Sequence, residues 1–175
     1  IEIEHQWSDD FNLSRKYPVN PFIPTDLSEL DARCREIFEI QVAALAKRFV
    51  HTGSKSAVVG ISGGLDSTLA LLVAVKTFDR LNYNRKGIVG ITMPGFGTTD
   101  RTYDNALGLM QALGITIKEI SVKDACIQHF KDIGHDIDNH NVTYENSQAR
   151  ERTQILMDYA NMCGGMVIGT GDMSE

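Results

Sequence analysis

The chain has 175 residues, of which 42% are hydrophobic and 23% charged, a balance typical of one globular domain with a sizeable core. Its net charge of −6 and isoelectric point near 5.3 argue against a nucleic-acid-binding or anionic-membrane-binding surface. The longest strongly apolar run, 69–75, is too short to cross a bilayer, and no signal-peptide pattern opens the sequence. We therefore expect a cytoplasmic protein without membrane or nucleic-acid partners.

The three cysteines, Cys34, Cys126 and Cys163, are widely spaced and form no C-x-x-C pair. An odd number of separated cysteines is not the pattern of a disulfide framework. We expect all three to be small buried residues in a reducing compartment.

The first 24 residues predict a linker or tail. They hold three of the four prolines and the only tryptophan, and their apolar residues follow no sustained period. Because the chain opens at Ile1 without a methionine and stops at Glu175 in a polar stretch, we interpret it as a piece of a longer polypeptide. Residues 25–175 are then expected to form one domain, truncated at its C-terminal end.

Helices and strands are predicted to alternate from residue 26 onward. A capping signal at Asp26, followed by apolar residues at three- and four-residue steps, predicts a helix to about Val50. The later elements are, in order, a strand over 57–61, a helix over 67–78, a strand over 87–93, a helix from 99 or 100 to 113, a strand over 115–122, helices over 124–133 and 146–162, and a strand over 166–169. This alternation predicts a doubly wound α/β fold, with a mostly parallel, Rossmann-like sheet and helices on both faces.

Three loops of this fold leave the carboxyl ends of strands: 62–66, 93–99 and 170–175. In open α/β sheets, ligands bind beyond these ends, at the point where the strand order reverses. We therefore expect the three loops to border one site.

The stretch 57–68 joins a buried strand, a glycine turn and a helix. The run 57–61 suits a strand covered on both faces, and a strong helical sequence opens at Ser67. Between them, the turn 62–64 removes side chains where the backbone could close on a ligand. This geometry points backbone N–H groups and the positive end of a helix dipole at an anion.

The residues of this turn narrow the choice of anion. No lysine follows the glycines, as a Walker A loop requires, and the fingerprint G-x-G-x-x-G is absent. Hydroxyl and amide groups can hold phosphate oxygens, and Asp66 suits a phosphate site if a divalent cation, most simply Mg²⁺, lies between carboxylate and phosphate. The alternatives are that Asp66 is a helix N-cap and that Gly63-Gly64 is an ordinary βα turn.

The residues Ser62-Gly63-Gly64-Leu65-Asp66-Ser67 resemble the S-G-G-x-D-S signature of the PP-loop ATP pyrophosphatases. The resemblance implies the adenine-nucleotide α-hydrolase type of fold and an enzyme that splits ATP between its α- and β-phosphates and transfers AMP to an acceptor. The signature does not select the acceptor, which differs among the NAD, GMP and asparagine synthetases and the tRNA-thiolating enzymes. The acidic composition weighs against the last of these.

Two further stretches carry candidate functional residues. Asn146 and Arg150 are four residues apart in a predicted helix, so they share a face. The segment 169–175 follows a buried strand, and its threonine and two carboxylates could complete a nucleotide and metal site. The alternatives are a solvated helix face for the charged residues and an ordinary capped turn for the segment.

These stretches narrow the resemblance to one family. Asn146-x-x-Ala149-Arg150-x-Arg152 and the segment 169–175 are similar to the second and third motifs of NAD synthetases. Met93-Pro94-Gly95-Phe96 and the helix around 34–43 are similar to the glutamine-dependent type. The resemblance covers roughly residues 21–175 and implies ATP-dependent amidation of deamido-NAD⁺ to NAD⁺ through an adenylated intermediate, with release of AMP and pyrophosphate.

The resemblance also implies roles for single residues. Those expected to contact ATP are Gly60, Ile61, Ser62, Gly63, Gly64, Leu65, Asp66, Ser67, Met93 and Thr170. Those expected to take part in catalysis are Asp66, Ser62 and Ser67. Those expected to bind deamido-NAD⁺ are Asn146, Arg150 and Glu175, and the expected Mg²⁺ ligands are Asp66 and Glu175. Arg152 matches the motif, but we expect it to have a structural role.

The expected partners also come from the resemblance. In glutamine-dependent relatives, an N-terminal glutaminase domain of the same polypeptide supplies ammonia, and residues 1–24 would be the linker behind it. A homo-oligomer is expected. Two other functions stay open: another PP-loop adenylating enzyme such as GMP synthetase, and an ATP-binding module that carries out no chemistry.

Overall fold

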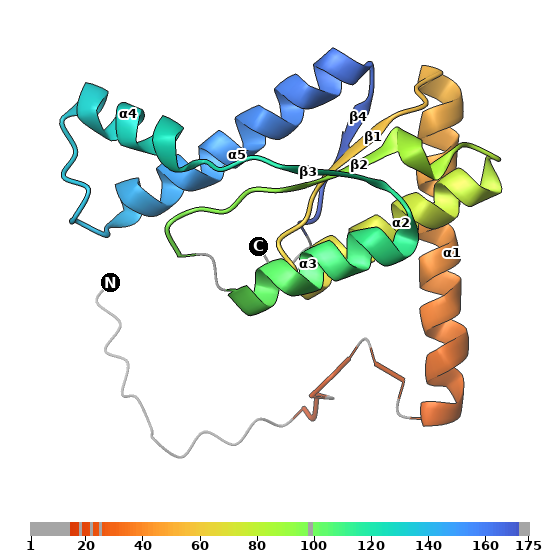
Figure 1. Cartoon of the computed structure of the whole chain (residues 1–175). Helices are drawn as coiled ribbons and strands as arrows, with labels where there is room; N and C mark the ends of the chain where they lie inside the picture. Colours follow the sequence, from red (N-terminus) through yellow and green to blue (C-terminus); the bar gives the residue numbers. More distant parts are fainter. Residues whose placement is uncertain (1–14, 18, 22, 25, 98–99, 172–175) are drawn as a thin grey trace, which may run out of the picture. The chain divides into compact units, whose positions relative to one another are not determined.

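The computed structural model describes residues 15–171 except 18, 22, 25, 98 and 99 (Figure 1). The chain divides into two compact units, residues 1–37 and 38–175, and helix α1 (Leu27–Thr52) contributes to both. In the first unit, Asp26 Oδ1 accepts hydrogen bonds from the backbone N–H and the hydroxyl of Ser28, at 2.8 and 2.7 Å. The predicted cap at the start of α1 is thereby confirmed. The first 14 residues of the predicted tail lie outside the described residues.

The second unit is built on a sheet in the order β3-β2-β1-β4, in which every described pair of strands is parallel. The strands are β1 (Ala57–Gly60), β2 (Ile88–Thr92), β3 (Thr116–Glu119) and β4 (Met166–Ile168). The chain moves from β1 outward through β2 to β3 and then returns to the other side of β1. The predicted doubly wound α/β fold is confirmed, and the strand order reverses beside the carboxyl end of β1.

Two layers of helices cover the sheet (Figure 1). Helices α2 (Leu65–Arg80) and α3 (Asp100–Leu113) pack on one face together with the second half of α1, whose Val42, Ala46 and Phe49 are buried. Helix α5 (Val142–Cys163) packs on the other face, and α4 (Lys123–Ile133) packs against α5. None of the helices that the structure describes is long and apolar enough to cross a bilayer.

Two helices begin two or more residues earlier than predicted. Helix α2 begins at Leu65 rather than at Ser67, and α5 begins at Val142 rather than at Asn146. The cause in α5 is Asn141, whose Oδ1 accepts hydrogen bonds from the N–H groups of the second and third helical residues at 2.9 and 3.2 Å. The predicted loop 79–86 is also partly ordered, because α2 continues to Arg80 and a 3₁₀ turn, η1, covers Arg85–Gly87.

The prediction that all three cysteines are buried is wrong for two of them. Cys126 is buried in α4, but Cys34 and Cys163 are exposed. Cys34 lies in the exposed first half of α1, and Cys163 is the last residue of α5, just before the left-handed cap residue Gly164. All three are free thiols.

Candidate functional site

The first βα corner of the chain has the form that the sequence predicts. Strand β1 ends at Gly60, and the N–H of Ile61 still donates to the carbonyl of Ile91 on β2 at 2.9 Å. Gly64 is the N-cap residue of α2 and makes no side-chain cap, so the alternative in which Asp66 caps this helix is wrong. Asp66 instead lies in the first turn of α2 and is exposed.

Two serine hydroxyls meet inside this corner. Ser62 Oγ and Ser67 Oγ are 3.2 Å apart, and the N–H of Gly64 donates to Ser62 Oγ at 3.2 Å. Ser67 is only 4% exposed, and its hydroxyl donates to the carbonyl of Gly64 at 3.1 Å. The N–H groups of the first turn of a helix have no acceptor within that helix, so the corner combines two hydroxyls with backbone donors. Such a cluster suits an anion.

Gly63 allows α3 to approach the corner. Its φ of +85° lies in the left-handed region that L side chains rarely adopt, and a Cβ at this position would overlap the carbonyl oxygen of Thr102. The glycine is therefore required here both by its backbone conformation and by the closeness of α3.

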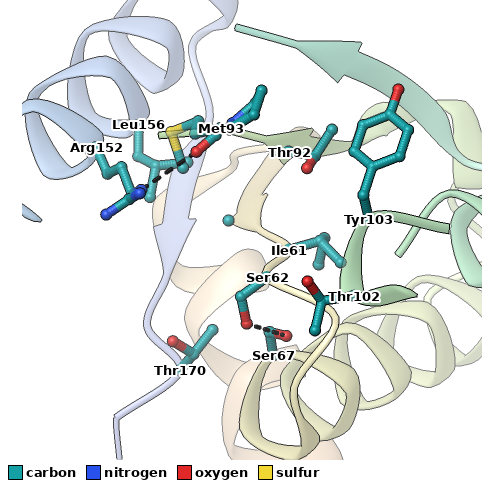
Figure 2. Close-up of a pocket in the computed structure, with 12 residues that line it drawn as sticks. Ile61, Ser62, Ser67, Thr92, Met93, Thr102, Tyr103, Arg152, Leu156 and Thr170 are labelled. Carbon is teal, nitrogen blue, oxygen red and sulfur yellow. Dashed lines mark hydrogen bonds between the residues drawn. The ribbon is translucent and has the colours of Figure 1, made fainter. Parts of the chain in front are cut away.

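The corner opens into a cavity of about 430 Å³ at the carboxyl edge of the sheet (Figure 2). Residues from three strand ends and from three helices, α2, α3 and α5, line it: Gly60, Ile61, Ser62, Ser67, Thr92, Met93, Pro94, Thr102, Tyr103, Arg152, Leu156 and Thr170. For the described residues, this confirms that the loops after β1, β2 and β4 border one site. Residues 98–99 and 172–175 of the two later loops lie outside the described residues.

Hydroxyl groups gather at one end of the cavity, and two apolar side chains line the opposite wall beside Arg152. Figure 2 shows Ser62, Ser67 and Thr170 together near the start of α2, while Met93 and Leu156 form the opposite wall. A Cβ on Gly60 would lie 3.1 Å from Leu156 Cδ1 and 3.2 Å from Met93 Cε, so the end of β1 lies directly against this apolar wall. The phosphates and the base of a nucleotide need these two environments in the same cavity.

Sequence reasoning did not select several of the lining residues. Thr102 and Tyr103 come from the first turn of α3, and Leu156 comes from α5. The Tyr103 hydroxyl donates to Glu119 at the end of β3, and this hydrogen bond raises the pKa of Tyr103. The only signal in the sequence was that α3 follows a loop expected at the site.

The remaining predicted residues lie outside this cavity. Asp66 lines a neighbouring cavity of about 530 Å³ with Thr170 and Gly171, and Thr170 borders both cavities. Leu65 is 81% exposed. Gly63 and Gly64 form the turn itself, and Glu175 lies outside the described residues.

Asn146 and Arg150 share a face of α5, as predicted. They line a shallow depression on that helix together with Ala149, Thr153 and Gln154, separate from the cavity at the βα corner. Arg152, for which a structural role was expected, lines the cavity, and its Nε donates to the carbonyl of Met93 at 3.3 Å. Among the residues that the structure describes, no three His, Cys, Asp or Glu side chains gather closely enough to hold a metal ion by themselves.

The fold and the cavity together define the class of protein: a Rossmann-like α/β domain with a donor-rich corner at the switch point of its sheet. Comparison with known proteins identifies the family. The profile of the NAD synthase family matches residues 37–175. The chain belongs to the NAD synthase family.

Three known proteins give the extent of the likeness. The glutamine-dependent NAD(+) synthetase of Mycobacterium leprae is 43% identical over 170 residues, which are 95% of this chain and 25% of that protein. The NH(3)-dependent NAD(+) synthetase of Methanococcoides burtonii is 34% identical over 138 residues, 78% of this chain and 50% of that protein. The solved structure of the glutamine-dependent NAD+ synthetase of Acinetobacter baumannii in complex with ADP has a TM-score of 0.73 at 26% identity, over 81% of this chain and 26% of that one. The chain therefore spans between a quarter and a half of the length of these relatives.

Proposed function

We propose that this chain is the ATP-dependent synthetase domain of an enzyme that amidates deamido-NAD⁺ to NAD⁺. The observation that carries the proposal is the corner at the end of β1, where two hydroxyls face one cavity beside a left-handed glycine turn and the N-terminus of a helix. Membership of the NAD synthase family supports the acceptor, and the relative from Acinetobacter baumannii holds ADP.

The polar end of the cavity would hold the triphosphate, with Ser62, Ser67, Thr170 and the backbone of 60–65 as donors. The base would lie toward Met93 on the apolar wall. A carboxylate oxygen of deamido-NAD⁺ would then attack the α-phosphorus, and the bond to pyrophosphate would break. Ammonia would attack the carbonyl carbon of the resulting acyl adenylate and lose a proton as AMP leaves. Because anions react with anions here, fixed donors contribute most of the catalysis.

Asp66 fits the role of a Mg²⁺ ligand. Its carboxylate is exposed in the first turn of α2, at the rim of the phosphate corner. Mg²⁺ is commonly held by one or two carboxylates together with substrate phosphates, so a complete cage of protein ligands is unnecessary. Asp66 and Glu175 would hold the ion, which when bound would neutralise charge on the leaving pyrophosphate.

Asn146 and Arg150 would bind deamido-NAD⁺ from α5, with Glu175 as a third contact. A guanidinium and an amide on one helical face suit the phosphates and hydroxyls of a dinucleotide. The greater identity to the glutamine-dependent relative favours glutamine as the source of ammonia, through an N-terminal glutaminase domain of the same polypeptide. A homo-oligomer in the cytoplasm completes the proposal, and three free thiols fit that reducing compartment.

The test is pyrophosphate release by the native full-length protein with ATP and one acceptor at a time. We expect release and NAD⁺ formation with deamido-NAD⁺ and none with xanthylate, and glutamine and ammonium salts are compared as donors. Release with xanthylate would instead favour a GMP-synthetase-like enzyme, and ATP binding without release would favour a module without chemistry. Asp66→Asn should lower the rate about 100-fold, whereas Asp132→Asn, an exposed change on α4, should not change it.

A further inference from the structure

Two side chains of α5 hold the loop that follows β2. Gln148 Oε1 accepts a hydrogen bond from the backbone N–H of Phe96 at 3.2 Å, and Arg152 Nε donates to the carbonyl of Met93 at 3.3 Å. Figure 2 shows the second of these contacts at the edge of the cavity. Both partners in the loop are backbone groups, so the two contacts fix the path of the loop itself.

Both polar atoms of the Gln148 side chain make hydrogen bonds to backbone groups. The residue is 4% exposed, and its Nε2 donates to the carbonyl of Tyr144 at 3.3 Å while its Oε1 holds Phe96. The ring of Phe96 packs against the ring of Tyr144, with 5.5 Å between their centroids. The ring of Tyr144 in turn stacks on that of Phe130 in α4, with 5.7 Å between centroids. The loop at Phe96 is therefore held by Gln148 and Tyr144, and these contacts favour one position of the loop over others.

Gly95 brings the loop close to both side chains. A Cβ at this buried position would lie 2.5 Å from Gln148 Oε1 and 2.6 Å from Arg152 Nη2. On the other side, the carbonyl of Pro94 accepts a hydrogen bond from the N–H of Val122 at 3.2 Å. The segment 93–96 is thus clamped between α5 and the chain that leads into α4.

We infer that Gln148 and Arg152 are positioning residues that fix the Met93 wall of the nucleotide cavity and thereby set the affinity for ATP. This inference rests on the proposed function. Met93 lines the cavity and packs beside Gly60 and Leu156, so a shift of the clamped loop would move the wall that the base is proposed to contact. Arg152 also lines the cavity, whereas Gln148 does not, and Gln148 is therefore the cleaner residue to change.

The first test is Gln148→Met in the native full-length protein. Methionine keeps the length of the side chain and removes both hydrogen bonds. We expect the Kd for Mg-ATP, measured by calorimetry without acceptor, and the KM for ATP to rise about tenfold. The KM for deamido-NAD⁺ should stay within about twofold, because its proposed contacts, Asn146 and Arg150, line a separate depression. The matched control is Gln111→Met on the exposed surface of α3, which should leave both constants unchanged.

The second test asks whether Gln148 and Gly95 act together, and it can be used even if Gln148→Met does not fold. Gly95→Ala places a methyl group against Gln148 Oε1 and Arg152 Nη2 and should weaken ATP binding, whereas Gln148→Ala removes the nearer of these two contacts. The double variant should therefore bind ATP at least threefold more tightly than the product of the two single effects predicts.

Unchanged ATP affinity in Gln148→Met, an equal rise in both KM values, or independent effects in the double variant would overturn the positioning role. If the unaltered protein binds ATP but forms no NAD⁺, the proposed function fails. The Kd of Gln148→Met for Mg-ATP then still tests the positioning role of Gln148. If the unaltered protein binds no ATP, both proposals fail.

Discussion

At Gly63, a hydrogen atom in place of a side chain allows the first βα corner and α3 to lie close together. Alanine there would be strained by the φ of +85° and would overlap the backbone of α3 at Thr102. The atoms that the methyl group would overlap belong to the backbone of the first turn of α3, which cannot move aside as a flexible side chain could. We predict that Gly63→Ala lowers the free energy of unfolding by about 2–4 kcal/mol, measured by urea denaturation.

Gly108 provides the matched control for this prediction. Gly108 lies in the middle of α3 on its exposed face, and its φ is not in the left-handed region. A Cβ on this residue would meet no atom within 4 Å. Gly108→Ala should therefore raise the free energy of unfolding by about 0.5–1 kcal/mol through helix propensity. Similar effects at the two glycines would contradict the role given to Gly63.

Single residues were predictable where the local sequence alone determines their position. Ser62 and Ser67 were selected from the motif, and they lie together in the cavity. Asp66 was selected for the same site but lines the neighbouring cavity, because successive residues of a helix point roughly 100° apart and Ser67 is the one that faces the first cavity. Leu156 and Gln148 could not be selected, since only the packing of α5 against the sheet brings them to the loop after β2.

At the level of elements, the order of helices and strands was predictable because each carries its own apolar run. Boundaries were less so, because they depend on caps. Asn141 begins α5, and the four residues after it carry no sustained apolar period. The early start matters for the site, since it brings Tyr144 into the helix and beneath Phe96.

The cap at Asn141 therefore gives a prediction for the whole of α5. Asn141→Ala would leave the N–H groups of Thr143 and Tyr144 without their side-chain acceptor. We expect the free energy of unfolding to fall by about 1 kcal/mol, measured in urea. Asn139→Ala, two residues earlier in the same exposed loop, should change it by less than about 0.5 kcal/mol. Equal losses in the two variants would contradict the capping role.

At the scale of the whole molecule, the alternation of elements predicts parallel strands but not their order. Nothing in the sequence of β4 says that it returns to pair with β1 rather than continuing beyond β3. That choice is made by packing: α2 and α3 cover one face, and α5 covers the other. Hydrogen bonds between the ends of elements add to this packing. Arg85 is the clearest case, because it donates to the carboxylate of Asp79 in α2 and to the carbonyl of Leu113 at the end of α3.

This contact predicts how the stability of the molecule depends on pH. Two hydrogen bonds of 2.7 Å from the Arg85 guanidinium hold the pKa of Asp79 below its ordinary value of 3.8. A carboxyl whose pKa is lower in the folded chain adds stability that is complete above the unfolded pKa and is lost as the pH falls through the folded value. Asp79→Asn should therefore lower the urea midpoint at pH 7, and its difference from the unaltered protein should shrink as the pH falls below about 4. Arg85→Gln should reproduce the loss at pH 7, and Asp79→Asn should add little to it. A difference that grows in acid would show that the pair does not stabilise the fold in this way.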